Sequence, residues 1–141
     1  MKRTIPYTTC AIMTRDSRMN AAGGIELNVR TLLPFFDRIE VYDTGSIDGS
    51  RQDLDRIKAQ NLFVYDLPWK GFADTRNDIL DRIRTRRVFF IDDDELPGLN
   101  KIDQLVDLVE ANPSTGAYWF TFAQFLKWPS KPYFTSVDEV K

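Results

Sequence analysis

The fold is decided by one stretch, residues 38–50, whose sequence is Arg38-Ile39-Glu40-Val41-Tyr42-Asp43-Thr44-Gly45-Ser46-Ile47-Asp48-Gly49-Ser50. We predict a strand in its first part, up to Tyr42. The part from Asp43 to Ser50 holds two glycines and is typical of a tight turn. We expect a helix next, with Leu54 and Ile57 facing inward. This strand–turn–helix unit is the building block of a parallel α/β sheet.

The same order of strand and helix recurs along the chain. We predict further strands at residues 7–13, 61–65, 88–91 and 117–122, and helices beginning at residue 25 and spanning 71–84 and 100–110. In the 71–84 helix the expected buried face consists of Phe72, Ile79, Leu80 and Ile83. The apolar 88–91 strand is typical of one buried on both faces of a sheet. We therefore expect a three-layer α/β/α sandwich with a mostly parallel, doubly wound central sheet.

Composition excludes several classes of function. The formal charge of −2 does not favour nucleic acid or an anionic membrane as a partner. No segment approaches the ~20 apolar residues of a transmembrane helix. The single cysteine, Cys10, lies in an apolar run; we interpret it as a small buried hydrophobe, which suits a cytoplasmic protein. Because the chain has no histidine, histidine-based triads are excluded, and oxygen ligands would favour Mg²⁺ or Mn²⁺.

Two polar clusters directly follow predicted strands. One runs from Asp43 to Ser50, and the other comprises Asp92-Asp93-Asp94-Glu95. Because ligands bind at the carboxyl ends of the strands in such sheets, both clusters are expected at one functional edge.

The acidic run Asp92-Asp93-Asp94-Glu95 suggests a cation site. Like charges packed together repel one another unless a cation neutralises them. In a strand continuation, Asp92 and Asp94 would share a face and Asp93 would point the other way. Two oxygen ligands spaced in this way suit Mg²⁺ or Mn²⁺ that phosphate oxygens also hold. The alternative is a solvated acidic turn.

Basic residues offer two further candidates. Arg76 lies on the flank of the buried helix face, where it either pairs with a carboxylate such as Asp43 or Asp92 or reaches a phosphate. A second group of arginines lies at the end of the same helix, where cations complement the helix dipole; a phosphate site is the alternative. This group consists of Arg82, Arg84, Arg86 and Arg87.

Three segments in register resemble glycosyltransferase family 2, the inverting transferases with the GT-A nucleotide-sugar fold. Residues 41–50 are similar to that family's "VVDTGSTDGT" stretch, and residues 72–77, Phe72-Ala73-Asp74-Thr75-Arg76-Asn77, to its "FSxARN" segment. Residues 90–95, Phe90-Ile91-Asp92-Asp93-Asp94-Glu95, are similar to the "WLDADE" form of its DxD motif. The likeness covers residues 8–122.

The resemblance implies a metal-dependent transfer of sugar from a UDP-, GDP- or dTDP-linked donor to an unidentified acceptor, with Mn²⁺ or Mg²⁺ as cofactor. It implies that Asp43 contacts the base and that Arg76 lies by the base or the diphosphate. Asp92 would lie near the ribose or the metal, and Asp94 would bind the metal. We count Asp93 with the donor-binding residues.

The resemblance is weaker at both ends of the donor site. An Asn-Glu pair often follows the family's first strand; Thr14-Arg15-Asp16 stands here, with Asp16 as the stand-in for the acid. The base that deprotonates the acceptor usually lies well downstream of DxD. This chain ends about 45 residues after Asp94, whereas family catalytic domains usually exceed roughly 200 residues. The late acids Asp138 and Glu139 are not assigned as base.

We therefore expect a nucleotide-sugar-binding domain over residues 1–125 and, over 126–141, a tail or the start of a missing acceptor region. A missing domain or a partner chain would supply the acceptor site. Two alternatives remain open. One is a truncated domain that binds the nucleotide sugar without catalysis. The other is a receiver-like phosphoacceptor domain, which the glycine turn fits poorly.

Overall fold

The computed structural model describes residues 3–117, 132 and 135–140. Within them strands and helices alternate along the chain, as the sequence predicts. The elements are β1 (Thr8–Thr14), α1 (Ile25–Leu32), β2 (Arg38–Asp43), α2 (Ser50–Arg56), β3 (Leu62–Asp66), α3 (Phe72–Arg82), β4 (Arg87–Asp92), α4 (Leu99–Ala111) and the short 3-10 helix η1 (Val137–Val140). The bounds of these four strands lie within one residue of those expected.

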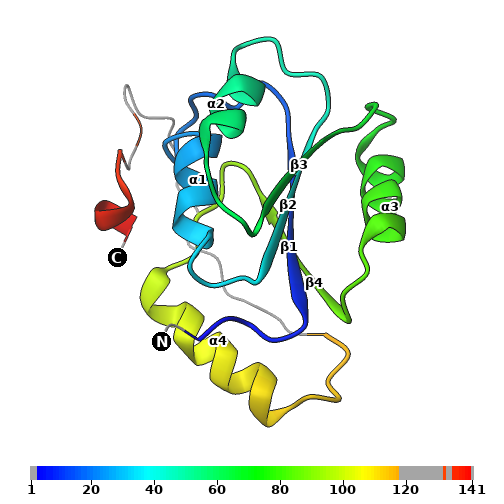
Figure 1. Cartoon of the computed structure of the whole chain (residues 1–141), viewed down its shortest axis with the longest axis vertical. Helices are drawn as coiled ribbons and strands as arrows, with labels where there is room; N and C mark the ends of the chain where they lie inside the picture. The colour runs from blue at the N-terminus through cyan, green and yellow to red at the C-terminus, as the bar shows by residue number, and fades with distance from the viewer. Residues whose placement is uncertain (1–2, 118–131, 133–134, 141) are drawn as a thin grey trace.

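The described strands form one parallel sheet in the order β3-β2-β1-β4. The chain builds outward from β1 to β3 and then returns to place β4 on the other side of β1. Because parallel crossovers are right-handed, this reversal moves the connecting helix to the opposite face. Figure 1 shows α1 and α2 on one face of the sheet and α3 on the other. The expected α/β/α sandwich is therefore confirmed, with its topological switch point between β1 and β4.

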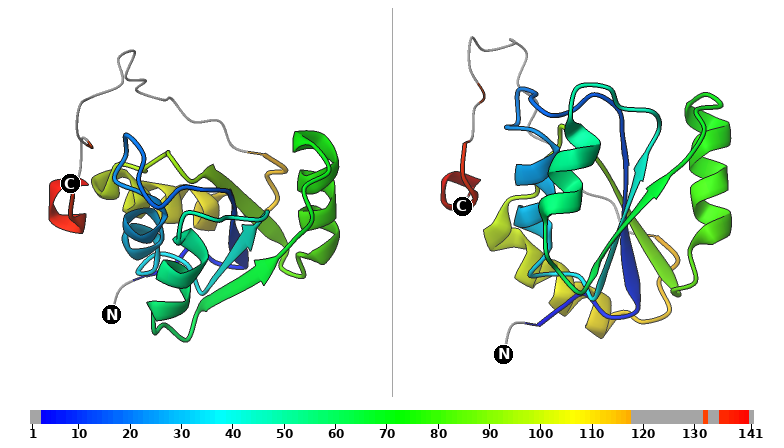
Figure 2. Two further views of the ribbon diagram at one scale, coloured as in Figure 1. Left: turned by 90° about the horizontal axis from the view of Figure 1, so that it is seen from above. Right: turned by 45° about the horizontal axis from the view of Figure 1, so that its top comes forward.

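Alternation along the strands supplies a core on each face of the sheet. Cys10 and Ile12 of β1 pack in one buried cluster with Val29 of α1 and Val106 of α4. Ala11 points the other way and belongs to a smaller cluster with Ile79 of α3 and Tyr42 of β2. Figure 2 gives two further views of these layers. Cys10 is fully buried and unbridged, as its interpretation as a small hydrophobe requires.

The buried face of α3 is narrower than predicted. Thr75 and Ile79 are its buried residues. Phe72 is 70% exposed and Leu80 is 45% exposed, so the prediction that both face the core is wrong. Among the described helices α3 alone covers its face of the sheet, so no neighbouring helix closes over its flanks.

β4 is also less buried than predicted. Of its residues only Ile91 is buried, so burial on both faces is wrong for the described sheet. The reason is that β4 is an edge strand there, paired with β1 alone. The fifth strand expected at 117–122 lies, from residue 118 on, outside the described residues, as does most of the 126–141 tail. No helix in the described ranges is long and apolar enough to cross a bilayer.

Candidate functional site

The carboxyl ends of the four strands form one polar edge. Asp43, the last residue of β2, pairs in register with Thr14 of β1 and with Asp66 of β3. On the other side of β1, Met13 pairs with Asp92 of β4. The two polar clusters therefore share an edge, as expected. Asp43 and Asp92 flank β1, so their backbones are roughly 10 Å apart.

Asp43 is buried at this edge, and one of its two carboxylate oxygens accepts no hydrogen bond from the described residues. Its Oδ1 accepts hydrogen bonds from the N–H groups of Gly45 (2.9 Å) and Ser46 (2.8 Å), which fold the chain back after β2. Its Oδ2 is buried and has no hydrogen-bond partner among the described residues. Such an oxygen costs about 1–3 kcal/mol unless a donor reaches it.

Arg76 reaches the same edge from α3 and pairs with Asp92. Its Nη2 lies 2.5 Å from Asp92 Oδ1, and its guanidinium lies 5.7 Å from the centre of the Phe90 ring. Of the partners considered from the sequence, the structure selects Asp92. The Arg76 Nε is buried and has no acceptor among the described residues. The edge therefore carries an unpaired acceptor on one side of β1 and an unpaired donor on the other.

The acidic run is a turn rather than a continued strand. β4 ends at Asp92, and the N–H of Glu95 donates to the carbonyl of Asp92 at 3.1 Å. Strand alternation therefore stops at Asp92 and cannot orient Asp94; this premise of the sequence argument was wrong. The N–H of Asp92 donates in turn to Glu95 Oε2 at 3.0 Å. The side chain of Asp94 is exposed at the turn.

Asp93 points inward, under the turn. Its Oδ2 accepts hydrogen bonds from Thr14 Oγ1 at 2.7 Å and from the hydroxyl of Ser17. Burial raises the pKa of Asp93 above its ordinary value, against the opposing effect of these hydroxyls. Asp93 thus ties the acidic turn to the end of β1 and to the loop that follows it.

Two asparagines that the sequence argument missed also hold the acidic turn. Asn28 of α1, 1% exposed, donates from Nδ2 to the carbonyls of Glu95 (2.6 Å) and Asp92 (3.3 Å). Asn20 donates to the carbonyl of Asp93 at 3.0 Å. The only sequence signal was an amide side chain between Leu27 and Val29, on a helix that faces the core.

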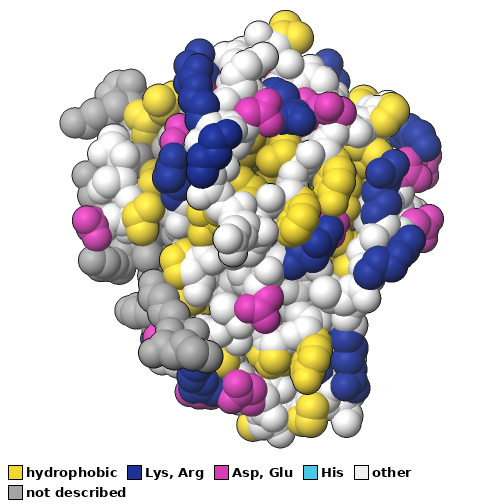
Figure 3. All heavy atoms as spheres, in the orientation of Figure 1, with side chains coloured by type: hydrophobic (Ala, Val, Ile, Leu, Met, Phe, Trp, Pro, Cys, Tyr) yellow, Lys and Arg dark blue, Asp and Glu magenta, His cyan; other side chains and the backbone are white. Residues whose placement is uncertain are grey.

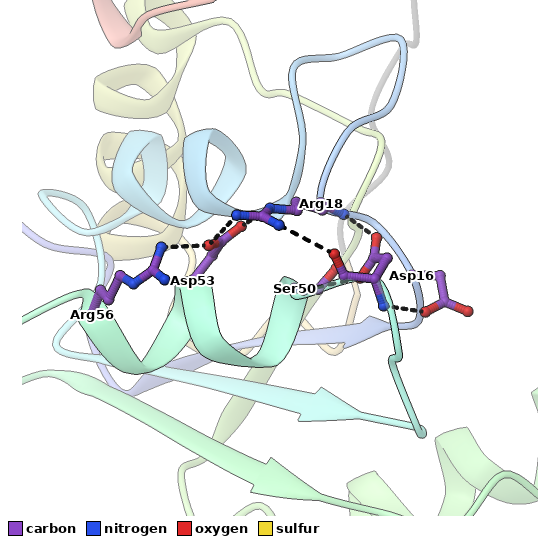
Figure 4. A network of polar contacts seen from close by, with 6 residues as sticks. Asp16, Arg18, Ser50, Asp53 and Arg56 are labelled. Carbon is purple, nitrogen blue, oxygen red and sulfur yellow. Dashed lines mark hydrogen bonds and ion pairs between the residues drawn. The ribbon is translucent and has the colours of Figure 1, made fainter.

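The loops after β1 and β2 are joined by a polar network (Figure 4). Asp16 Oδ1 accepts hydrogen bonds from the N–H groups of Ile47 (2.7 Å) and Asp48 (3.3 Å). The backbone N–H of Arg18 donates to Asp48 Oδ2 at 2.8 Å. The side chain of Arg18 forms an ion pair with Asp53 of α2, with 2.9 Å between Nε and Oδ2. Asp16 therefore braces the loop beside Asp43 through backbone contacts.

An exposed aromatic pair stands at the same edge. The N–H of Leu67 donates to the carbonyl of Asp43 at 2.8 Å, so the loop between β3 and α3 leaves from beside Asp43. On this loop and the first turn of α3, Trp69 and Phe72 meet edge to face, with ring centres 4.9 Å apart. Both are substantially exposed, so they offer an apolar surface beside the polar edge.

The carboxylates fit a cation that arrives with a ligand rather than one held by protein alone. Within residues 3–117, 132 and 135–140, no three Asp, Glu, His or Cys side chains gather around one point. Mg²⁺ is commonly held by one or two carboxylates together with phosphate oxygens. Asp94, exposed, and Asp92, half exposed, match that requirement.

Comparison with known proteins gives one family. Residues 20–136 match the model of "Glycosyl transferase family 2". This range contains Asp43, Arg76 and the acidic turn, and it covers most of the chain. A search of curated proteins gave no match. The match confirms the resemblance and removes the receiver-like alternative. The chain belongs to glycosyl transferase family 2.

Proposed function

We propose that this glycosyltransferase binds a nucleoside-diphosphate sugar at the carboxyl edge of its sheet and transfers the sugar to an acceptor with inversion, assisted by a divalent cation. One observation carries the proposal. Two buried polar atoms at this edge, Asp43 Oδ2 and Arg76 Nε, lack partners among the described residues. The first needs a donor and the second an acceptor. A nucleotide offers both, as the N–H groups of its base and the oxygens of its diphosphate.

The five acidic and basic residues expected at the donor divide into two groups. In the first group, Asp43 accepts a hydrogen bond from the base, Arg76 contacts the diphosphate, and Asp92 lies near the ribose or the metal. Asp93 and Asp16 act indirectly in this proposal, because their carboxylates are engaged by Thr14 and Ser17 and by the 44–50 loop. They position the acidic turn and the loop against which the nucleotide binds.

The proposed cation is Mn²⁺ or Mg²⁺, held by Asp94 and Asp92 together with diphosphate oxygens. When bound, it neutralises charge on the departing diphosphate. In the transfer, the acceptor oxygen forms a bond to the anomeric carbon, the bond to the diphosphate breaks, and a base takes the acceptor proton. We assign no residue to that base. A partner chain or a further domain is the proposed source of the acceptor site.

The test is calorimetry of UDP, GDP and dTDP with the full chain, with and without Mn²⁺. We expect one of the three to bind, and to bind more tightly with Mn²⁺. Asp43→Asn retains an oxygen for Gly45 and Ser46 but replaces the spare acceptor with a donor, so it should weaken binding by about tenfold or more.

The matched control is Asp37→Asn, an exposed aspartate at the opposite end of β2. It should bind as the unmodified chain does. No binding by any nucleotide, or equal weakening in both variants, would overturn the donor site. Binding without sugar transfer or donor hydrolysis would assign the chain to the non-catalytic alternative.

A further inference from the structure

A cavity lies on the face of the sheet that α3 covers. Its volume is about 510 Å³, within the range of small-molecule sites. It is lined by Arg38, Glu40, Tyr42, Tyr65, Arg82, Arg84 and Thr85. Arg38 begins β2 and lies roughly 17 Å from Asp43 at its end; Tyr42, next to Asp43, also lines the cavity, with its side chain on the opposite face of the strand from Asp43. None of the residues proposed to bind the donor or the cation lines this cavity, so it is a separate site.

The one acid of the cavity is already satisfied. Glu40 is 3% exposed and lies 2.5 Å from Arg38 Nε, and it also accepts a hydrogen bond from the Tyr42 hydroxyl. Burial and this bond raise the pKa of Tyr42, so its hydroxyl remains a donor to Glu40. The negative charge of Glu40 is therefore balanced by Arg38 and is not free to repel an anion.

Two further arginines of the cavity have no acidic partner. Among the described residues, no carboxylate lies within ion-pair distance of Arg82 or Arg84. Arg84 donates from Nη1 to the carbonyl of Asp81 at 2.5 Å, which leaves other guanidinium donors unused. Figure 3 shows Lys and Arg side chains together with Asp and Glu side chains over α3, at the right of the view. The lining thus has a surplus of positive charge.

The tyrosines add a donor and an apolar wall. Tyr65 accepts a hydrogen bond from Arg38 Nη2 at 3.1 Å, so its own hydroxyl proton is free for a ligand. The Tyr42 and Tyr65 rings stack, with centres 5.4 Å apart. Helix-dipole compensation explains arginines at the end of α3, but it does not explain a cavity whose unpaired groups are all donors.

We propose that this cavity binds the phosphate group of a small molecule, held by the guanidinium groups of Arg82 and Arg84 and by the Tyr65 hydroxyl. Guanidinium groups match phosphate oxygens in geometry as well as in charge. The ligand is inorganic phosphate or a phosphate monoester, since the cavity is large enough for a group beyond the phosphate.

The test is a titration of the ¹⁵N-labelled full chain, observed by two-dimensional NMR, with inorganic phosphate and separately with glycerol phosphate at constant ionic strength. We expect saturable shifts of the amide signals of Glu40, Tyr65 and Thr85. Arg82→Ala/Arg84→Ala should weaken binding by about tenfold or more. If the double alanine variant does not fold, the double variant Arg82→Gln/Arg84→Gln is used in its place. Tighter binding of one probe identifies the source of the phosphate.

The matched control is Arg86→Ala, an exposed arginine of the same segment that does not line the cavity. It should bind phosphate as the unmodified chain does. Three results would overturn the proposal: shifts that do not saturate, equal weakening in the control, or shifts confined to the carboxyl edge. Failure of UDP to bind at Asp43 would leave the proposal unaffected, because the two sites report on different signals.

Discussion

Arg76 of α3 and Asp92 at the end of β4 form an ion pair, with 2.5 Å between Nη2 and Oδ1, across 16 residues of sequence. The pair joins the helix on one face of the sheet to the acidic turn at the switch point. Both side chains are nearly half exposed, so the pair contributes little to stability. Its consequence is positional: it holds the Arg76 guanidinium, proposed to contact the diphosphate, beside the carboxylates proposed to bind the metal.

Replacing Arg76 with Ala should therefore affect binding more than folding. We expect the affinity for the preferred nucleoside diphosphate to fall by about tenfold or more. The free energy of unfolding should fall by less than about 1 kcal/mol. Arg76→Lys keeps the positive charge but loses the planar guanidinium, so its affinity for the nucleotide should lie between those of the unmodified chain and Arg76→Ala. Calorimetry and urea unfolding measure the two effects, with Arg30→Ala, from the exposed Arg30–Glu26 pair, as control. Unchanged affinity in Arg76→Ala would contradict the assignment.

Asn28 should matter both to stability and to the acidic turn. Asn28→Ala leaves the Glu95 and Asp92 carbonyls without their side-chain donor, so we expect a loss of about 1–3 kcal/mol in the free energy of unfolding. The loosened turn should also weaken Mn²⁺-dependent nucleotide binding, measured by calorimetry. Thr31→Val is the matched control, because Thr31 is buried on the same helix but, within the described part of the chain, its hydroxyl bonds only to the Leu27 carbonyl. If both variants weakened nucleotide binding equally, Asn28 would have no specific role.

Substitution by alanine should lower the free energy of unfolding by different amounts at two glycines of the loop after β2. Gly45 (φ +103°) and Gly49 (φ +98°) both have left-handed backbones, which cost an alanine roughly 1–2 kcal/mol. A Cβ on Gly45 meets open space, whereas one on Gly49 would lie 2.8 Å from Arg18 Nη1. Gly49→Ala should therefore destabilise more, because it displaces Arg18 from Asp53. In an Arg18→Ala background the two glycine variants should cost the same in urea unfolding; a persistent difference would contradict this explanation.

Asp48 should make the stability of the loop network depend on pH. Desolvation acts to raise the pKa of Asp48, but hydrogen bonds from Ser50 and the Arg18 N–H outweigh it and hold the pKa below its ordinary value. A depressed folded-state pKa contributes stability that is present above the unfolded pKa and is lost as pH falls through the folded pKa. The stability difference between the unmodified chain and Asp48→Asn should therefore shrink from pH 7 to pH 3. Urea unfolding at both values measures it, and a constant difference would refute the prediction.

The sequence by itself determined the order of elements and the edge that carries the site. Residues 38–42 predict a strand, and the turn-rich segment with glycines at 45 and 49 follows directly, so the strand was expected to end and turn near Asp43. Parallel topology then brings the residues that follow β2 and β4 to one edge without further information. For this reason Asp43 and Asp92 could be placed at the same edge before their contacts were known.

Contacts between distant residues were decided only by the tertiary structure. Periodicity placed Phe72 on the apolar face of α3, but how much of that face is covered depends on the neighbours that α3 lacks among the described helices. Likewise, the partner of Arg76 depends on where α3 crosses the sheet, and the support from Asn28 depends on where α1 meets the acidic turn. Local sequence sets the periodicity of apolar side chains along each helix and strand, and it sets the positions of the turns. Which side chains meet is set by the packing of whole elements, because that packing brings together residues far apart in the chain.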